Sequence, residues 1–250
     1  MMEKEKDASA RAFEFAAGFA ADKGICRFTR FLDPAQAASA AAVARGHGVA
    51  FASWGGYEQA ERTIGCFFPR GETVDRDQYP LVCLHSAFSA KFCSLSHRDI
   101  LGAFMALGLT RDCIGDIIIG DEDVFLFVAQ QSSGLVAQSL TSAGKTPLCF
   151  HVPEGDVVLP EPRGTAFHAV AASLRLDAVI ACAYHLSRSE ASEAIRAGGI
   201  KLDHIPCDRV DTPVAEGAML SMRGKGRIRL QRIEGLTRKQ RIGLTFFRYE

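Results

Sequence analysis

The first 77 residues mix the apolar periodicities of helices and strands. Helical spacing over residues 8–21 predicts a first helix, and a second is expected after Asp33, which can cap a first turn that contains Pro34. Two short apolar runs, residues 49–51 and 63–68, predict strands. We therefore expect a small α/β domain over residues 1–77 that ends in the polar stretch before residue 78.

Residues 78–160 follow a strand–helix–strand–strand–helix–strand order. Ser96 and Asp99 have the spacing of a capping box at the start of an apolar helix, and residues 120–123 form the turn of a hairpin. Two helices over a four-stranded antiparallel sheet are typical of a ferredoxin-like (RRM-like) domain. The predicted strands are 81–85, 117–119, 124–128 and 148–152, and the predicted helices are 96–108 and 135–143.

The aromatic residues of this central domain do not favour base stacking. Phe125 and Phe127 alternate along one strand, but they lack the basic residue and glycine of the RNA-recognition signature. Residues 81–160 also hold four basic residues against eight acidic ones. We expect a scaffold domain with both phenylalanines on its core face.

A proline-containing connector precedes the C-terminal domain. Residues 160–164 predict extended chain, and we place a linker at residues 161–170. Ser173 is expected to cap one helix, and Ser187 a second, because Glu190 completes a capping box. The elements predicted within residues 171–250 are helices at 173–183 and 187–198 and strands at 200–202, 219–222 and 227–230.

The charge of the chain is zero overall but uneven along its length. The 29 basic residues balance 29 acidic ones, yet residues 219–250 hold nine basic residues against two acidic ones. Residues 1–218 therefore hold 20 basic and 27 acidic residues. Such asymmetry indicates a polyanionic partner for the C-terminal end.

Basic side chains from two C-terminal elements are expected to form one phosphate-binding surface. Arg227 and Arg229 alternate with aliphatic residues, so a strand places both on one face, and Lys225 extends that side from the preceding turn. Arg188 lies in the first turn of a helix, where free backbone N–H groups favour an anion, and Arg196 follows two turns later. We predict that these groups converge on one anion-binding patch.

Four motifs in this region resemble the S-four RNA-binding domain, named for a protein of the small ribosomal subunit. They span about residues 171–230 in the order typical of that domain, and strings upstream resemble the YlmH-type proteins. These are bacterial cytoplasmic proteins with a C-terminal S-four domain, so the resemblance covers nearly the whole chain. The S-four motifs are residues 173–177, 186–189, 195–201 and 222–227, and the upstream strings are residues 31–34, 55–57, 61–62, 96–108 and 115–117.

The resemblance implies a fold: a multi-domain α+β protein with a small α/β domain, a ferredoxin-like (RRM-like) central domain and an S-four domain with a basic tail over residues 171–250. It also implies a function. YlmH-type proteins bind structured RNA (rRNA and tRNA), associate with the large ribosomal subunit, and are linked to rescue of stalled large-subunit–peptidyl-tRNA complexes in ribosome-associated quality control. Their association with cell division is looser.

Several residues are candidates for RNA contact. Arg175, Asp177, Ser187 and Arg188 match S-four motif positions, whereas Asp203 departs from the asparagine-containing turn usual there. The full set of candidate RNA-binding residues is Arg175, Asp177, Ser187, Arg188, Arg196, Lys201, Arg223, Lys225, Arg227 and Arg229.

Other function classes lack supporting motifs. No run is long and apolar enough to cross a membrane, and the charged N-terminus lacks signal-peptide features, so we expect a cytoplasmic protein. The eight cysteines are scattered without a C-x-x-C pair, and no glycine-rich loop after a strand predicts a cofactor. We expect no catalytic residues, metal or cofactor. The alternatives are an RNA-modifying enzyme with an unrecognised active site in residues 1–160 and a protein-interaction adaptor in cell division.

Overall fold

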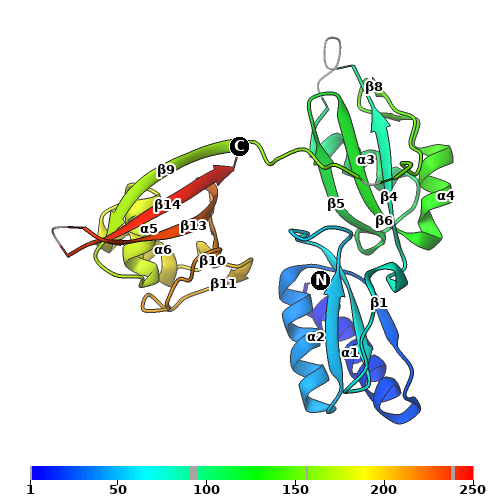
Figure 1. The fold of residues 1–250 in the computed structure, drawn as a ribbon, viewed down its shortest axis with the longest axis horizontal. Coiled ribbons are helices and arrows are strands. Elements are labelled where there is room, and N and C mark those ends of the chain that lie inside the picture. Colours follow the sequence, from blue (N-terminus) through cyan, green and yellow to red (C-terminus); the bar gives the residue numbers. More distant parts are fainter. Residues whose placement is uncertain (1, 90–94, 156, 238–239, 250) are drawn as a thin grey trace. The chain divides into compact units, whose positions relative to one another are not determined.

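The computed structural model describes residues 2–89, 95–155, 157–237 and 240–249. The chain divides into two compact units, Met1–Glu161 (unit 1) and Pro162–Glu250 (unit 2), and both mix helices with sheets (Figure 1). The division falls within the proline-containing stretch at residues 160–164. Unit 1 contains two separate three-stranded sheets, one before and one after residue 77.

The first half of unit 1 is an antiparallel sheet of order β1-β3-β2 on which two helices pack. Phe13, Ala40 and Phe67 belong to the core between the helices and this sheet. The helix expected after Asp33 is confirmed, because the Asp33 carboxylate accepts from the backbone N–H of Gln36 (2.8 Å) and the Gln36 side chain accepts from that of Asp33 (2.9 Å). The elements are α1 (Met2–Lys23), β1 (Arg27–Leu32), α2 (Pro34–Gly46), β2 (Ala50–Trp54) and β3 (Thr63–Phe68).

The second half of unit 1 has the sheet order β4-β6-β5, and α3 and α4 pack against it. The hairpin is confirmed as β5 and β6, and Ser96 caps α3 through the expected box with Asp99. The second helix begins five residues earlier than predicted, directly after β6. The elements are β4 (Leu81–Ala87), α3 (His97–Ala106), β5 (Ile114–Ile119), β6 (Asp123–Ala129), α4 (Gln130–Ser139), the short strands β7 (Ser142–Ala143) and β8 (Thr146–Pro147), and the 3-10 turns η1 (Arg76–Gln78) and η2 (Arg111–Cys113).

The strand predicted at residues 148–152 is reduced to a single bridge. His85 and His151 exchange both backbone hydrogen bonds, with N···O distances of 2.8 and 3.0 Å. The N–H of Cys149 instead donates to the Ser86 hydroxyl at 2.8 Å, so the ladder does not extend. Leu148 and Phe150 are nevertheless buried in the core beneath α3 and α4. The segment therefore lies beside β4 at the sheet edge without forming a regular strand.

The two faces of β6 are both buried, but against different partners. Val124, Leu126 and Val128 point into the core shared with α3 and α4. Both phenylalanines are buried, as the prediction of a core position requires, but the alternation of the strand directs Phe125 and Phe127 to the face opposite α3 and α4. Phe127 is buried there in a cluster that also takes side chains from β1 and β3.

A network of polar groups ties the two halves of unit 1 together. The Asp116 carboxylate accepts hydrogen bonds from the Tyr57 hydroxyl (2.8 Å) and from the backbone N–H groups of Glu61 (2.7 Å) and Arg62 (3.1 Å). The Arg62 guanidinium donates to the carbonyl oxygens of Phe31, Arg111 and Ile114. Burial raises the pKa of Asp116, although its hydrogen bonds from Tyr57 and the backbone oppose this shift. Burial also lowers the pKa of Arg62, although the charges of neighbouring aspartates oppose this shift.

Unit 2 is a six-stranded sheet of order β11-β10-β12-β13-β14-β9 with α5 and α6 against one face (Figure 1). The linker predicted at residues 161–170 is wrong from residue 164 onward, because residues 164–171 form β9, which pairs along its whole length with β14. The elements are β9 (Gly164–Ala171), α5 (Leu176–Ala183), α6 (Arg188–Arg196), β10 (Ile200–Leu202), β11 (Ile205–Pro206), β12 (Met219–Met222), β13 (Gly226–Leu236) and β14 (Ile242–Tyr249).

The core of unit 2 lies between the sheet and its helices. Ile228, Leu230, Leu244 and Phe246 are buried against apolar side chains of α5 and α6. Strand residues alternate between faces, so the intervening side chains of β13 and β14 point away from both helices. We call the surface on that side the open sheet face.

Three further properties of the described residues bear on function. None of the described helices is long and apolar enough to span a membrane. In the same part of the chain, no group of three or more His, Cys, Asp or Glu side chains could hold a metal ion. The seven described cysteines are unpaired; Cys66 and Cys113 are buried, whereas Cys149 is exposed.

We expect Asp116→Ala to destabilise unit 1 by about 2–4 kcal/mol, because it removes the acceptor of two backbone N–H groups and one hydroxyl. Chemical denaturation followed by the fluorescence of Trp54, the single tryptophan, measures this loss. The exposed carboxylate of Glu72 provides a matched control, and Glu72→Ala should change stability little. Equal midpoints for both variants would contradict the role given to Asp116.

Candidate nucleic-acid interface

The start of α5 is organised around a buried carboxylate. The Asp177 side chain is only 6% exposed, and it forms ion pairs with Arg175 and Arg188, both with N···O distances of 3.2 Å. The two arginine side chains are 44% and 56% exposed. A buried charge is costly unless it is paired, so Asp177 fixes both guanidinium groups while leaving a large part of each open to solvent. Asp177 therefore positions arginines and does not itself present a surface to RNA.

The pKa of Asp177 reflects this balance. Burial alone would raise the pKa, but hydrogen bonds from Arg175 and Arg188, followed by their charges, hold it below its usual value. The carboxylate is therefore ionised at neutral pH. With one carboxylate and two guanidinium groups, the cluster keeps a net positive charge.

The helix starts differ from one another in how they are capped. Ser187 caps α6 as expected: its hydroxyl accepts from the N–H of Glu190 (3.2 Å), and the Glu190 carboxylate accepts from the N–H of Ser187 (2.7 Å). The prediction that Ser173 caps the preceding helix is wrong, because α5 starts later and its N-cap residue is Arg175. Ser187 thus holds the first turn of α6, where Arg188 lies.

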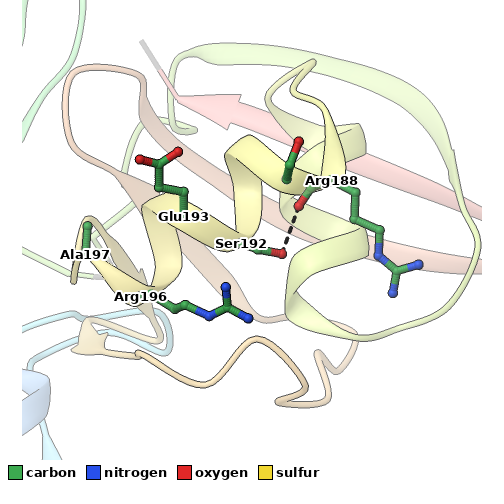
Figure 2. A pocket seen from close by; sticks show the side chains of 6 residues that line it. Arg188, Ser192, Glu193, Arg196 and Ala197 are labelled. Carbon is green, nitrogen blue, oxygen red and sulfur yellow. Dashed lines mark hydrogen bonds between the residues drawn. The ribbon is translucent and has the colours of Figure 1, made fainter.

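One side of α6 carries both of its arginines. Arg188, Ser192 and Arg196 are spaced four residues apart, which places them on the same side of the helix, and the Ser192 hydroxyl donates to the Arg188 carbonyl at 2.8 Å. Figure 2 shows these three side chains together, with Glu193 pointing elsewhere. They border an open depression of about 800 Å³, which is lined by Arg188, Ser189, Ser192, Glu193, Arg196 and Ala197. We call this surface the α6 arginine face.

The turn between β12 and β13 approaches the start of α6. The charge of Lys225 contributes to the lowered pKa of Glu190, after the larger effect of the hydrogen bonds from Ser187. Arg223 is exposed, and its backbone N–H donates to the carbonyl of Gly199 just beyond α6 at 3.2 Å. Lys225 therefore lies near the helix side of unit 2, whereas for Arg223 the structure gives a backbone contact with Gly199.

Three other candidates lie elsewhere. Lys201, Arg227 and Arg229 alternate with residues buried against the helices, so they belong to the open sheet face. The prediction that Arg188 and the β13 arginines converge on one patch is therefore wrong. The alternation of β13 was predicted from its sequence, but the side of the sheet covered by α5 and α6 decides where the arginines point.

Two further residues hold the site together: Tyr184, which the sequence did not single out, and Asp203, which it did. The buried Tyr184 hydroxyl, at the end of α5, lies 3.0 Å from the carbonyl oxygens of both Leu220 and Gly226. Asp203 adopts a left-handed backbone conformation (φ 48°), and its carboxylate accepts from the N–H of Met219 at 2.7 Å. Asparagine and aspartate both tolerate this conformation, which accounts for Asp203 where the S-four pattern has asparagine.

The helix pair and sheet of unit 2 correspond to a known class of RNA-binding module. Residues 174–220 match the family described as "S4 domain", the S-four domain expected from the motifs. Residues 75–152 match the family described as "Putative RNA-binding domain in YlmH".

A curated relative that matches most of the chain belongs to the same class. The chain is 35% identical over 223 residues to the "Ribosome-associated protein quality control protein P2" of Bacillus subtilis (strain 168), covering 89% of this chain and 87% of that protein. The fold resembles that of the "Cell division protein ylmH from Streptococcus pneumoniae" (TM-score 0.52, 23% identity), over 60% of this chain and 91% of that one. The chain belongs to the YlmH-type family of RNA-binding proteins with a C-terminal S-four domain.

We expect Asp177→Asn to weaken RNA binding even though it removes a negative charge, because Arg175 and Arg188 lose the group that orients them. A binding titration with tRNA, compared with wild type, measures the change. Stronger binding by the variant would mean that Asp177 acts as a repulsive charge and would contradict its positioning role.

The same substitution should lower stability in a pH-dependent way. Because the folded-state pKa of Asp177 is lowered, its ion pairs contribute fully above the unfolded-state pKa of about 3.9 and are lost as pH falls through the folded-state pKa. Urea unfolding followed by circular dichroism should therefore show the largest difference between wild type and Asp177→Asn near neutral pH. A difference that stays unchanged as the pH falls through the range in which Asp177 becomes protonated would contradict this.

Proposed function

We propose that this protein is a non-enzymatic RNA-binding factor of ribosome-associated quality control that recognises structured RNA on the large ribosomal subunit–peptidyl-tRNA complex. The observation that carries the proposal is the α6 arginine face, where Asp177 fixes Arg188 beside Arg175 and the helix adds Arg196. Guanidinium groups held in place bind phosphate oxygens through paired N–H donors without first losing side-chain freedom. This surface lies in the segment that matches the S-four family.

The partners follow from the chemistry of the surface and from the relatives. Arginine contacts with phosphates supply affinity without reading base sequence, which suits a ligand recognised by its folded backbone. The Bacillus subtilis relative is named for ribosome-associated quality control, and this supports ribosomal RNA and tRNA as the ligands.

We propose that the protein acts by occupancy and catalyses no reaction. Among the described carboxyl groups, Asp116 has a raised pKa, which is a property of many general acids and bases. Its carboxylate, however, accepts three hydrogen bonds from Tyr57 and from the backbone of Glu61 and Arg62. This arrangement supports a structural role for Asp116 and argues against an RNA-modifying enzyme.

The salt dependence of RNA binding tests the α6 arginine face. Each phosphate contact that is lost should reduce the slope of log affinity against log salt concentration by about 1. We expect the double variant Arg188→Gln/Arg196→Gln to bind tRNA more weakly. We also expect the magnitude of its salt slope to be smaller than that of wild type by about 1 to 2. Filter binding or fluorescence anisotropy over a range of salt concentrations measures both quantities.

Arg45→Gln/Arg70→Gln provides the matched control, because it makes the same charge change at two exposed positions in unit 1. Its slope should equal that of wild type. Circular dichroism should show both proteins folded, since Asp177 keeps its pair with Arg175 when Arg188 is replaced. An unchanged slope for the folded double variant would count against the proposed surface.

Binding to purified ribosomal subunits tests the choice of partner. We expect the full chain to co-sediment with large subunits in preference to small ones, and the Arg188→Gln/Arg196→Gln variant to lose most of this binding. Crosslinking in cells followed by sequencing of the attached RNA would then locate the site. Equal co-sedimentation with both subunits would contradict the assignment to the large subunit.

A further inference from the structure

The open sheet face of unit 2 combines basic and aromatic side chains in adjacent rows. Arg229 of β13 lies directly opposite Phe247 of β14. One residue pair further along, the Arg227 guanidinium carbon lies 5.6 Å from the centre of the Tyr249 ring. Ser221 pairs with both Arg227 and Lys201, so the same row continues onto β10. Because directly opposed residues share a face, these side chains form one continuous surface.

The two aromatic rings are half-buried and presented together. Phe247 and Tyr249 have ring centres 5.0 Å apart in an edge-to-face arrangement. Their partners on β9 are Ala166 and Gly164, which have small side chains or none. A Cβ atom added to Gly164 would lie 2.6 Å from the Phe247 ring, so the ring rests against the glycine backbone. These small β9 residues therefore leave part of each ring uncovered on the open sheet face.

The charge of this face is predominantly positive. Lys201, Arg227 and Arg232 are exposed, and Arg229 is partly exposed. The carboxylate of Glu234 lies at the far end of the face, where it accepts from the Thr245 hydroxyl and pairs with His168 at 3.2 Å. The aromatic end, in contrast, has Arg227 and Arg229 as its charged neighbours on β13.

We infer that the open sheet face binds a single-stranded RNA segment, with bases stacked on Phe247 and Tyr249 and the backbone held by Arg227, Arg229 and Lys201. Aromatic rings flanked by cations on a sheet are the chemistry of single-strand binding, because every base offers a face for stacking and the basic residues attract the phosphates. A protein partner would also cover aromatic rings, but four basic residues make a polyanion the better electrostatic match.

This inference rests on the proposed RNA-binding function and extends it to a second surface and a second class of RNA. The segment that matches the S-four family ends at residue 220, so β13, β14 and β9 lie outside it. The face also lies on the side of the sheet away from α5 and α6, and so away from the α6 arginine face.

Titration with a short oligouridylate and with tRNA distinguishes the two surfaces. Phe247→Leu/Tyr249→Leu keeps apolar volume but removes the stacking rings, and we expect it to weaken oligouridylate binding by about tenfold or more. Its affinity for tRNA should change much less. Arg188→Gln/Arg196→Gln should instead weaken tRNA binding and change the affinity for oligouridylate much less. Phe15→Leu, which removes a ring that is 66% exposed in unit 1, is the matched control and should bind both RNAs like wild type.

A second measurement remains informative if the double variant does not fold. Tyr249→Trp keeps an aromatic ring, and its fluorescence, after subtraction of the Trp54 signal of wild type, should be quenched when oligouridylate is added.

The inference would be overturned if folded Phe247→Leu/Tyr249→Leu bound oligouridylate with an affinity within twofold of wild type. It would also be overturned if oligouridylate left the emission of Tyr249→Trp unchanged. Either result would favour a protein partner for this face. Retained tRNA binding without oligouridylate binding would overturn it while leaving the proposed function intact. Failure of wild type to bind either RNA would refute both.

Discussion

The buried carboxylate of Asp177 is the constraint on which the candidate site depends. A charge that is only 6% exposed must be compensated, and the compensation comes from two elements, the residue that begins α5 and the first turn of α6. The positions of Arg175 and Arg188 and the net positive charge of the cluster are thereby fixed together. Arg188 donates its Nε–H to Asp177 and holds one Nη atom in ion-pair contact with it, so other N–H donors of its guanidinium group face away from the carboxylate and can bind a phosphate.

Features decided by a few neighbouring residues could be predicted from the sequence. The capping boxes at Asp33, Ser96 and Ser187 are examples, because the residues that make them lie three positions apart. Features that depend on pairing between segments far apart in the sequence could not be predicted in this way. Residues 164–170 look like part of a linker, yet they belong to β9, which pairs with β14 more than seventy residues later in the chain. In the same way, the strand expected at residues 148–152 is interrupted because the hydroxyl of Ser86, on β4, accepts the hydrogen bond from the N–H of Cys149.

The candidate site shows the same division between local and tertiary information. Alternation along β13 correctly predicts that Arg227 and Arg229 share a face, since this depends on strand geometry alone. It does not reveal which face α5 and α6 cover, and the expectation of a single patch with Arg188 failed for that reason. Asp177 was similarly taken for a contact residue, because its burial is a tertiary property of the α5–α6 corner.

The α6 arginine face and the open sheet face both exist because helices cover the sheet of unit 2 on one side only. The helix side gains a buried carboxylate and a capped helix start, which hold arginines rigidly and suit the backbone of a folded RNA. The other side needs no aromatic residues for stability, since the core is already closed by Leu244 and Phe246 facing the helices. Phe247 and Tyr249 are only half-buried there and place apolar surface beside Arg227 and Arg229, an arrangement that suits base stacking.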